Sequence, residues 1–306
     1  MNLKKLIVIV GPTCVGKTDF SIELSKKIKS KSEIISADSL QVYDKFNICT
    51  SKPSSEQLSE VKHHLIGSVP ICEEYSVYSF VNDAKKIIEN IYTKGKIPII
   101  VGGTGLYIDA LLNNFQFEES DIKNVDINIK DSEMYEHLKK IDPLSAQYID
   151  KNDYRRIRHS IAFFEQHGFS ILSQKQNTLL SEQKFDVIKI GLNFKNRYLL
   201  YDRINKRVDN MVEKGLLDEI DNIRKIKISK TASAAIGYKE LLPYFKGEIS
   251  LTEAINKMKQ QTRRYAKKQI TWFKRCEKTR WIFLDENQNL KKIANTIFNT
   301  FIKSWI

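Results

Sequence analysis

The segment that most restricts the fold of this chain is GPTCVGKT, which spans Gly11 to Thr18 and directly follows the apolar run Leu6–Val10. It has the G-x-x-x-x-G-K-[ST] spacing of a phosphate-binding loop. The residues that follow, Thr18–Ile28, space their apolar side chains as a helix does. A buried strand, a glycine-rich turn and a helix in this order predict an α/β fold with a P-loop-containing parallel-sheet core. Loops of this kind usually bind ATP or GTP.

The alternation of strands and helices continues along the chain with one interruption. Residues 118–130 are polar and poorly periodic, and residues 133–176 have a helical pattern. We therefore expect residues 1–113 and 185–306 to form the α/β core, and residues 114–184 to form a mostly helical insertion domain. The segments expected to be further core elements are the strands Glu33–Ser36, Ile97–Val101, Phe185–Leu192 and Trp281–Leu284, the helix Val81–Tyr92, several helices within Arg197–Arg275, and a terminal helix ending near Ser304.

The charge balance favours a polyanionic partner. The chain of 306 residues has 50 Lys and Arg against 37 Asp and Glu, which gives a formal net charge of +13. Nucleic acid and an anionic membrane surface are the partners that such a charge attracts. A merely lysine-rich surface is the alternative, and charge alone does not decide between them.

The four cysteines are scattered along the chain and form no C-x-x-C pair, which argues against a disulfide framework and a zinc site. A reducing cytoplasm is the simplest setting for such a chain. No apolar stretch approaches the length of a membrane-spanning helix. We therefore expect a cytoplasmic protein that has no membrane partner, and a monomer, because nothing in the sequence demands a dimer.

The residue types of the loop suit a diphosphate or a triphosphate. Gly11 and Gly16 let the backbone curl so that its N–H groups and the helix N-terminus face an anion. Lys17 brings a positive charge to phosphoryl oxygens, and the hydroxyl of Thr18 can ligate Mg²⁺. The loop residues predicted to bind diphosphate are Gly11, Pro12, Thr13, Cys14, Val15, Gly16, Lys17 and Thr18.

A nucleotide hydrolase normally carries an acidic residue at the end of another buried strand. The candidate strand here, Ile97–Val101, instead runs into the sequence Gly-Gly-Thr-Gly at 102–105. Asp38 follows the second strand, at the sheet edge where α/β proteins bind ligands. In a small-molecule kinase Asp38 would accept a proton from a hydroxyl or help to hold Mg²⁺, and in an alkyl transferase it would accept a proton from a weak nucleophile. It would otherwise only cap the following turn, and spacing alone does not decide among these roles.

The loop is the first of seven motifs that occur in order between residues 11 and 275: GPTCVGKT, ISADSLQVY, TSKP, HHLI, VGGTGLYIDALL, AIGYKEL and TRRYAKKQITWFKR. This series resembles that of the tRNA dimethylallyltransferases, also called tRNA isopentenyltransferases, of bacterial type. The resemblance implies transfer of a dimethylallyl group from dimethylallyl diphosphate to N6 of the adenosine 3′ of the anticodon in tRNA, with release of diphosphate and a need for Mg²⁺. It also implies that the loop holds an isoprenoid diphosphate and not a nucleotide.

The same resemblance implies roles for single residues. Asp38 is similar to the general base of the family, and Thr104 matches a position near the reacting groups. Arg203 and Arg207 lie four residues apart on one predicted helix and resemble arginines that reach the diphosphate. The predicted catalytic residues are Asp38, Lys17, Thr104 and Arg207.

Basic residues gather in two segments that suit an RNA backbone. DYRRIRH, at 153–159 in the predicted insertion, has three arginines and a histidine, and TRRYAKKQITWFKR, at 262–275, interleaves basic and aromatic residues. Trp272 and Phe273 suit core positions better than stacking on RNA. Residues 38–41 fall where the family contacts the target nucleotide. The residues predicted to contact the anticodon stem-loop of tRNA are Asp38, Ser39, Leu40, Gln41, Arg155, Arg156, Ile157, Arg158, His159, Arg263, Arg264 and Lys267.

The chain departs from the family at His159, where members usually carry Arg, and at Gly67, where Asp is frequent. Three other functions share part of the pattern. A P-loop kinase would share the loop and Asp38 but would leave the Gly-Gly-Thr segment and the basic C-terminal helices unexplained. An adenylate isopentenyltransferase would alkylate free nucleotides and has no need of the basic segment. A non-catalytic RNA-binding protein has no use for a diphosphate loop beside a carboxylate.

Overall fold

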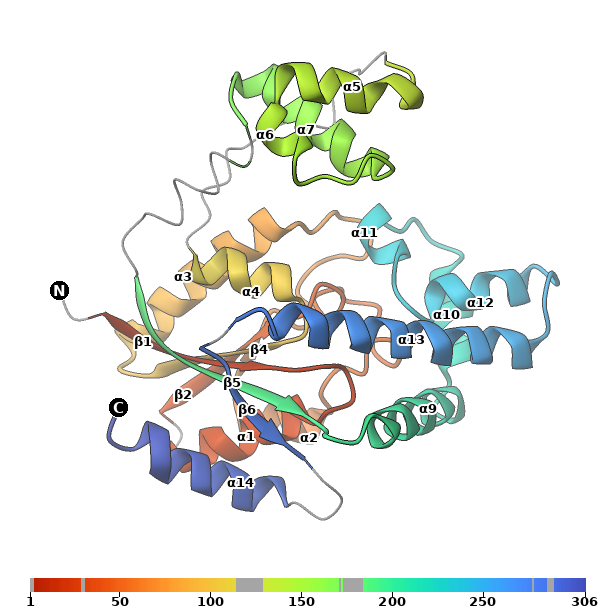
Figure 1. Ribbon diagram of the computed structural model, residues 1–306. Helices are drawn as coiled ribbons and strands as arrows, with labels where there is room; N and C mark the ends of the chain where they lie inside the picture. The colour runs from red at the N-terminus through yellow and green to blue at the C-terminus, as the bar shows by residue number, and fades with distance from the viewer. Residues whose placement is uncertain are drawn as a thin grey trace. The chain divides into compact units, whose positions relative to one another are not determined.

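The computed structural model describes residues 3–28, 31–113, 129–170, 172, 184–276, 278–284 and 289–306. The chain divides into two compact units, Met1–Asp109 with Phe185–Ile306, and Ala110–Lys184. Figure 1 labels the helices and strands of both units.

Within the described residues, the first unit contains one parallel sheet. Its strands are β1 (Lys4–Val10), β2 (Ser32–Ala37), β3 (His63–His64), β4 (Ile97–Gly102), β5 (Phe185–Asn193) and β6 (Arg280–Phe283). Their order across the sheet is β3-β2-β4-β1-β5-β6, and all neighbouring strands are parallel. The predicted α/β fold with a parallel-sheet core is therefore confirmed. β3 was not predicted, because two residues are too few for a periodic pattern.

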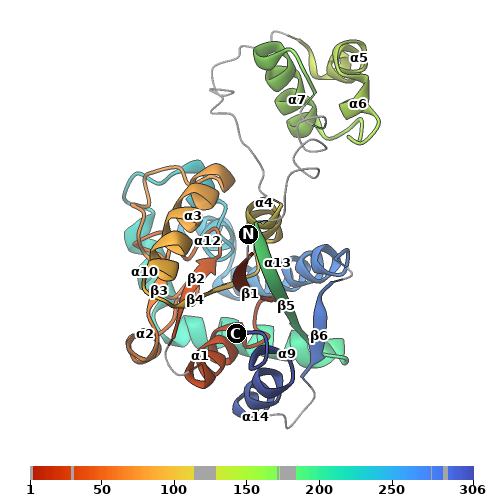
Figure 2. The ribbon, with the colours of Figure 1, turned by 90° about the vertical axis from the view of Figure 1, so that its left-hand side faces the viewer.

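Helices pack on both faces of this sheet and beyond its carboxyl ends. The helices in the described part of this unit are α1 (Lys17–Lys27), α2 (Ser55–Glu60), α3 (Val77–Thr93), α4 (Gly105–Leu112), which begins in it, α9 (Arg197–Glu213), α10 (Leu216–Ile223), α11 (Lys230–Ser233), α12 (Tyr238–Phe245), α13 (Leu251–Phe273) and α14 (Leu290–Ile297), the last continuing into a π-helical turn (Phe298–Ile302). α1 and α14 lie together on one face, and α3, α4 and α13 lie on the other (Figures 1 and 2).

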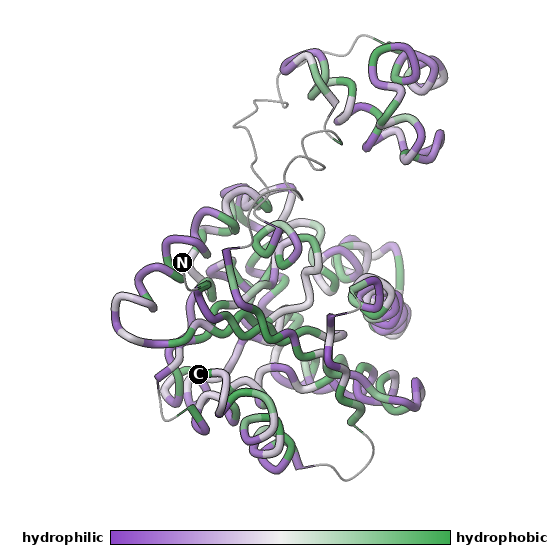
Figure 3. The backbone as a smooth tube through the Cα atoms, turned by 60° about the vertical axis from the view of Figure 1, so that its left-hand side comes forward, coloured by the Kyte–Doolittle hydropathy of each residue, from purple (hydrophilic) through white to green (hydrophobic). Residues whose placement is uncertain are grey.

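The core of the first unit follows from this layering. Leu6 to Val10 are fully buried, because β1 lies in the interior of the sheet and helices cover it on both sides. Figure 3 shows the strands as hydrophobic segments in the middle of the unit, with hydrophilic stretches on the helices around them.

The second unit is helical in the part that the structure describes. Its helices are α5 (Asp131–Ile141), α6 (Pro143–Ala146) and α7 (Tyr154–His167). They pack through a core of their own, made of Met134, Leu138, Ala146, Ile157, Ile161 and Ala162. The predicted polar segment 118–130 and the end of the predicted helical region, up to 176, lie mostly outside the described residues.

His64 of the HHLI motif has a structural role at the edge of the sheet. His64 on β3 lies 2.7 Å from a carboxylate oxygen of Glu33 on β2, and Lys96 lies 2.9 Å from the other oxygen. Burial raises the pKa of Glu33, but the hydrogen bonds from Lys96 and His64 outweigh burial and bring that pKa down to about 2. The buried carboxylate therefore stays ionised and fastens β3 to β2.

The register of the sheet brings the carboxyl ends of three strands level. Gly102 of β4 pairs with Val10 of β1 on one side and with Ala37 of β2 on the other. A Cβ atom on Gly102 would lie 2.1 Å from the carbonyl oxygen of Ala37, so only glycine fits there. The loops that follow β1, β2 and β4 consequently begin side by side.

We expect Gly102→Ala to lower the free energy of unfolding by about 2–3 kcal/mol, because the added methyl group would overpack the β2–β4 contact. Gly95→Ala serves as a comparison, since a Cβ there meets nothing within 4 Å and only the left-handed φ of +65° opposes it. That change should cost about 1 kcal/mol. Urea unfolding followed by circular dichroism measures both, and equal midpoints for the two variants would contradict the predicted contact.

Candidate active site

Three loops meet at the carboxyl edge of the sheet. The diphosphate-type loop, Gly11–Gly16, joins β1 to α1, and Asp38 begins the loop after β2. Gly103 and Thr104 join β4 to α4. Because β2, β4 and β1 are neighbours in this order, the structure brings the predicted catalytic residues Asp38, Thr104 and Lys17 to one place.

Lys17 is half-buried, and its ammonium group lies against the loop that it follows. Its ammonium group donates to the carbonyl oxygens of Gly11, at 3.0 Å, and Pro12, at 2.8 Å. Burial lowers the pKa of Lys17 to about 8, and the nearby charge of Arg207 adds to this effect, while Asp38 and Cys14 oppose it. The loop thus holds a cation that is poorly solvated and is suited to meet an anion.

α9 supplies two arginines to the same loop. Arg207 donates to the hydroxyl oxygen of Thr13, at 2.9 Å, and to the carbonyl oxygen of Thr50, at 3.3 Å. Arg203 donates to the carbonyl oxygen of Cys14, at 2.9 Å. Both predicted arginines therefore reach the loop, although they lie almost 200 residues away in the sequence.

Asp38 is held by the turn that it begins. Its Oδ1 accepts hydrogen bonds from the backbone N–H groups of Leu40, at 2.9 Å, and Gln41, at 3.3 Å. The hydroxyl oxygen of Thr104 accepts the N–H of Ser39, at 3.2 Å. Asp38 thus caps the turn that follows it, which is one of the roles considered for it from the sequence. A hydrogen bond to Thr104 holds the same turn.

The side chains of the other residues of this turn differ in whether their polar groups are already bonded within the protein. Gln41 uses its whole carboxamide within the protein, because Oε1 accepts the hydroxyl of Ser36 and Nε2 donates to the carbonyl oxygens of Thr50 and Ser51. Its side chain therefore holds the segment after β2 in place. The side chains of Ser39 and Leu40 are half-buried.

Gly67, one of the two departures from the family pattern, adopts a left-handed φ of +61°. Its N–H donates to the carbonyl oxygen of Gln41, at 2.9 Å. A Cβ there would lie 3.3 Å from the ammonium nitrogen of Lys52. An Asp tolerates this φ better than most residues and would face a cation here, so either residue suits the position.

α13 contributes side chains that the sequence interpretation did not assign to the site. Gln269 is 5% exposed and bonds to both the diphosphate-type loop and the Gly-Gly-Thr segment, through Thr13 and Gly103. The hydroxyl of Tyr265 lies close to the side chains of Thr104 and Gln269. Burial raises the pKa of Tyr265, and the nearby charge of Asp38 adds to this effect, so its hydroxyl stays protonated.

The inner face of α13 also explains the glycines of the Gly-Gly-Thr-Gly segment. A Cβ on Gly103 would lie 2.0 Å from Nε2 of Gln269, and one on Gly105 would lie 2.2 Å from the ring of Trp272. Trp272 donates to the carboxylate of Asp109, at 2.7 Å, and Phe273 is fully buried. Phe273 is therefore a core residue, as predicted. Trp272 is half-buried, and its ring packs against the Gly-Gly-Thr-Gly segment.

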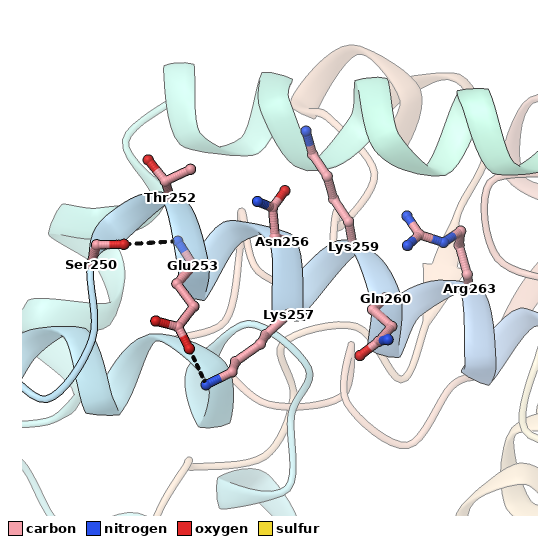
Figure 4. Close-up of a pocket in the computed structure, with 8 residues that line it drawn as sticks. All are labelled: Ser250, Thr252, Glu253, Asn256, Lys257, Lys259, Gln260 and Arg263. Atoms are coloured by element: carbon pink, nitrogen blue, oxygen red, sulfur yellow. Dashed lines mark hydrogen bonds and ion pairs between the residues drawn. The ribbon is translucent and has the colours of Figure 1, made fainter.

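The predicted RNA contacts on α13 fall into two groups. Arg264 and Lys267 are exposed, whereas Arg263 donates to the side-chain oxygen of Asn205 on α9, at 2.7 Å. Lys259 makes a second link to α9, at 2.6 Å from Asp209. Figure 4 shows Lys259 and Arg263 projecting toward the neighbouring helix. They border a cavity of about 520 Å³ lined by Ser250, Thr252, Glu253, Asn256, Lys257, Lys259, Gln260 and Arg263.

The second unit carries the predicted RNA contacts of the DYRRIRH segment, all of which except Asp153 lies on α7. Arg155, Arg156, Arg158 and His159 are exposed, and Arg158 lies 2.8 Å from a carboxylate oxygen of Asp131. The prediction for Ile157 is wrong. This side chain is fully buried in the core of the helical unit, where an RNA strand cannot reach it.

A bound Mg²⁺ would find only part of its ligands in the protein. Thr18 is half-buried at the start of α1, and its hydroxyl oxygen is of the hard type that Mg²⁺ prefers. In the part of the chain that the structure describes, no cluster of three or more His, Cys, Asp or Glu residues is arranged to hold a metal. The arrangement fits an ion that takes most of its ligands from a diphosphate and water. The described part of the chain also contains no helix suited in length and apolarity to spanning a membrane.

Comparison with known proteins agrees with this geometry. The family model described as IPP transferase matches residues 41–276. A tRNA dimethylallyltransferase of Caldanaerobacter subterraneus subsp. tengcongensis is 40% identical over 305 residues, with 96% of both chains covered. One of Lactobacillus gasseri is 40% identical, with 100% of this chain and 99% of the relative covered.

Solved structures give the same result. A tRNA isopentenylpyrophosphate transferase of Bacillus halodurans has a TM-score of 0.71 at 36% identity, over 97% of this chain and 96% of that one. A eukaryotic dimethylallyltransferase described as acting on tRNA has a TM-score of 0.81 at 30% identity, over 98% of this chain and 80% of that one. From its sequence, its fold and the grouping of residues at the sheet edge, this chain belongs to the IPP transferase family, the family of the tRNA dimethylallyltransferases.

Proposed function

We propose that this protein transfers a dimethylallyl group from dimethylallyl diphosphate to N6 of the adenosine at position 37 of tRNA, next to the anticodon, and releases diphosphate. The observation that carries the proposal is the meeting of a diphosphate-type loop with the carboxylate of Asp38 at one sheet edge. Membership of the family supports it. The cytoplasm, where reduced thiols and tRNA coexist, is the proposed location.

The donor side consists of the loop and its cations. As the bond between the allylic carbon and the diphosphate oxygen breaks, negative charge grows on the diphosphate. The N–H groups of the loop, Lys17 and Arg207 would stabilise that charge, with Arg203 at the rim. Lys17 and Arg207 are half-buried, which strengthens their effect because water screens their charges less, whereas Arg203 is exposed.

The acceptor side is centred on Asp38. The lone pair of an adenine N6 amine is delocalised into the ring, so the amine needs a base as the new C–N bond forms. Within the described residues, both hydrogen bonds to Asp38 end on Oδ1, and Oδ2 remains to accept the amine proton. Thr104 and Ser39 would help to orient the base, since they are linked to each other beside Asp38.

Mg²⁺ is part of this proposal as a ligand of the donor. Thr18 would hold it, together with oxygens of the diphosphate and water. When bound, it would neutralise charge on the leaving diphosphate.

The basic surfaces are proposed to bind the anticodon stem-loop. On α13 the exposed Arg264 and Lys267 would contact phosphates, and in the helical unit Arg155, Arg156, Arg158 and His159 would do so. The target adenine must leave its stack to reach Asp38. This costs least in a single-stranded loop, which favours an anticodon loop over a duplex.

The proposed reaction can be tested by mass spectrometry of nucleosides from unmodified tRNA incubated with the protein, Mg²⁺ and dimethylallyl diphosphate. We expect an adenosine heavier by one dimethylallyl group, and no modified AMP when AMP replaces tRNA. Asp38→Asn keeps an acceptor for the turn but removes the base, so turnover should fall by about 10²–10⁴-fold. Asp44→Asn, which keeps an acceptor for the N–H of Ile71, is the control and should retain activity.

Modified AMP without modified tRNA would replace the proposal by a free-nucleotide transferase. ATP consumption without any adduct would indicate a kinase. Full turnover by Asp38→Asn would leave the transfer reaction standing and remove Asp38 as its base.

The pKa of Lys17 predicts a pH dependence of diphosphate binding. Lys17 is charged below pH about 8 and neutral above it, and an anion binds the charged form better. Binding of inorganic diphosphate should therefore take up a proton near pH 8, and affinity should fall by up to about tenfold per pH unit above it. Calorimetry in buffers of different ionisation enthalpy measures the uptake. The Lys17→Met variant should bind inorganic diphosphate more weakly and without proton uptake. Diphosphate binding to the wild-type protein without proton uptake would contradict the role given to Lys17.

A further inference from the structure

The inner face of α13 contacts the segments that follow β1 and β4. Tyr265, Gln269 and Trp272 are spaced four and three residues apart, so they form one stripe along the helix. The hydroxyl of Tyr265 lies close to Thr104, Gln269 bonds to the two loops, and Trp272 bonds to Asp109 at 2.7 Å. One helix thus contacts both the donor side and the acceptor side.

Gln269 forms the most direct link between the two sides. Its Oε1 accepts the N–H of Thr13 in the diphosphate-type loop, at 2.8 Å, and its Nε2 donates to the carbonyl oxygen of Gly103, at 3.1 Å. The carboxamide is buried, so water does not compete for either bond. One planar group therefore sets how far apart the two loops lie.

The distance that Gln269 controls matters for a transfer reaction. Thr13 belongs to the loop after β1, and Gly103 precedes Thr104, which is tied to the turn of Asp38. The transferred carbon must lie between the leaving diphosphate and the attacking amine, with the reacting atoms about 3–3.5 Å apart. A change of about 1 Å in loop separation can cost 10²-fold in rate.

We propose that Gln269 is a positioning residue that sets the separation of the diphosphate loop and the Asp38–Thr104 side, braced by the hydroxyl of Tyr265. This inference rests on the proposed function. Gln269 touches neither substrate in this scheme and acts through Thr13 and Gly103. Neither of these contacts follows from the motif spacing, because the partners lie more than 160 residues apart.

Gln269→Met tests the proposal, since it keeps an unbranched side chain of similar length and removes both hydrogen bonds. Functional sites are first counted by titration with inorganic diphosphate, so that unfolded protein does not contribute. Single-turnover transfer to tRNA is then measured at saturating dimethylallyl diphosphate. We expect the rate per site to fall by about 10²-fold. The dissociation constants of diphosphate and tRNA should change by less than about threefold, because binding groups remain in place.

Two further variants keep the test decisive. Gln260→Ala changes an exposed glutamine of the same helix and should transfer at the wild-type rate. Tyr265→Phe removes only the bracing hydroxyl and should lower the rate by about fivefold, which decides the matter if Gln269→Met does not fold.

A Gln269→Met protein with an unchanged rate per site would overturn the inference and leave the proposed function intact. A loss of affinity for diphosphate or tRNA as large as the loss of rate would also overturn the inference, because Gln269 would then act in substrate binding. If the wild-type protein itself makes no adduct on tRNA, the proposed function fails and the inference fails with it.

Discussion

Three neighbouring strands end in register at one edge of the sheet, and the rest of the site depends on this constraint. Val10, Gly102 and Ala37 lie opposite one another across β1, β4 and β2. The loop proposed to bind the diphosphate and the turn of Asp38 therefore begin two strand spacings apart, about 10 Å. That interval is wide enough for a transferred carbon and the amine that attacks it. A shifted register on β4 would separate the two sides along the sheet and leave no common place for both substrates.

Burial of charge is the physical basis of the proposed stabilisation of a leaving diphosphate at this edge. Lys17 is covered by the loop carbonyls, and burial lowers its pKa to about 8. Arg207 is held by hydrogen bonds to Thr13 and Thr50, so protein groups fix the position of both cations. Preorganised charges of this kind need little rearrangement during the reaction. The same surroundings keep the hydroxyl of Tyr265 protonated close to Asp38.

Local patterns allowed much of this to be predicted, and tertiary contacts account for what was missed. The phosphate-binding loop is predictable because a strand, a glycine-rich turn and a helix leave a short-range signal. Asp38 is singled out by its place after the second strand, and its role as a base is implied only by the resemblance to the family. Gln269 and Tyr265 were not assigned, because their partners Thr13 and Thr104 lie on other elements. Ile157 was misassigned although a signal was present. Its spacing of four residues from Ile161 indicates the buried face of a helix, and the neighbouring arginines concealed it.

The stereochemistry of the transferred carbon tests the central claim, which is direct displacement between the diphosphate loop and Asp38. The donor would be dimethylallyl diphosphate that carries one deuterium, placed stereospecifically on its reacting carbon. The configuration of that carbon would then be determined in the modified adenosine. The account predicts inversion, because the amine attacks from the Asp38 side as the diphosphate leaves toward its loop. Retention would contradict the account by requiring a covalent intermediate with the protein, and a racemic product would contradict it by requiring a carbocation that turns freely in the site.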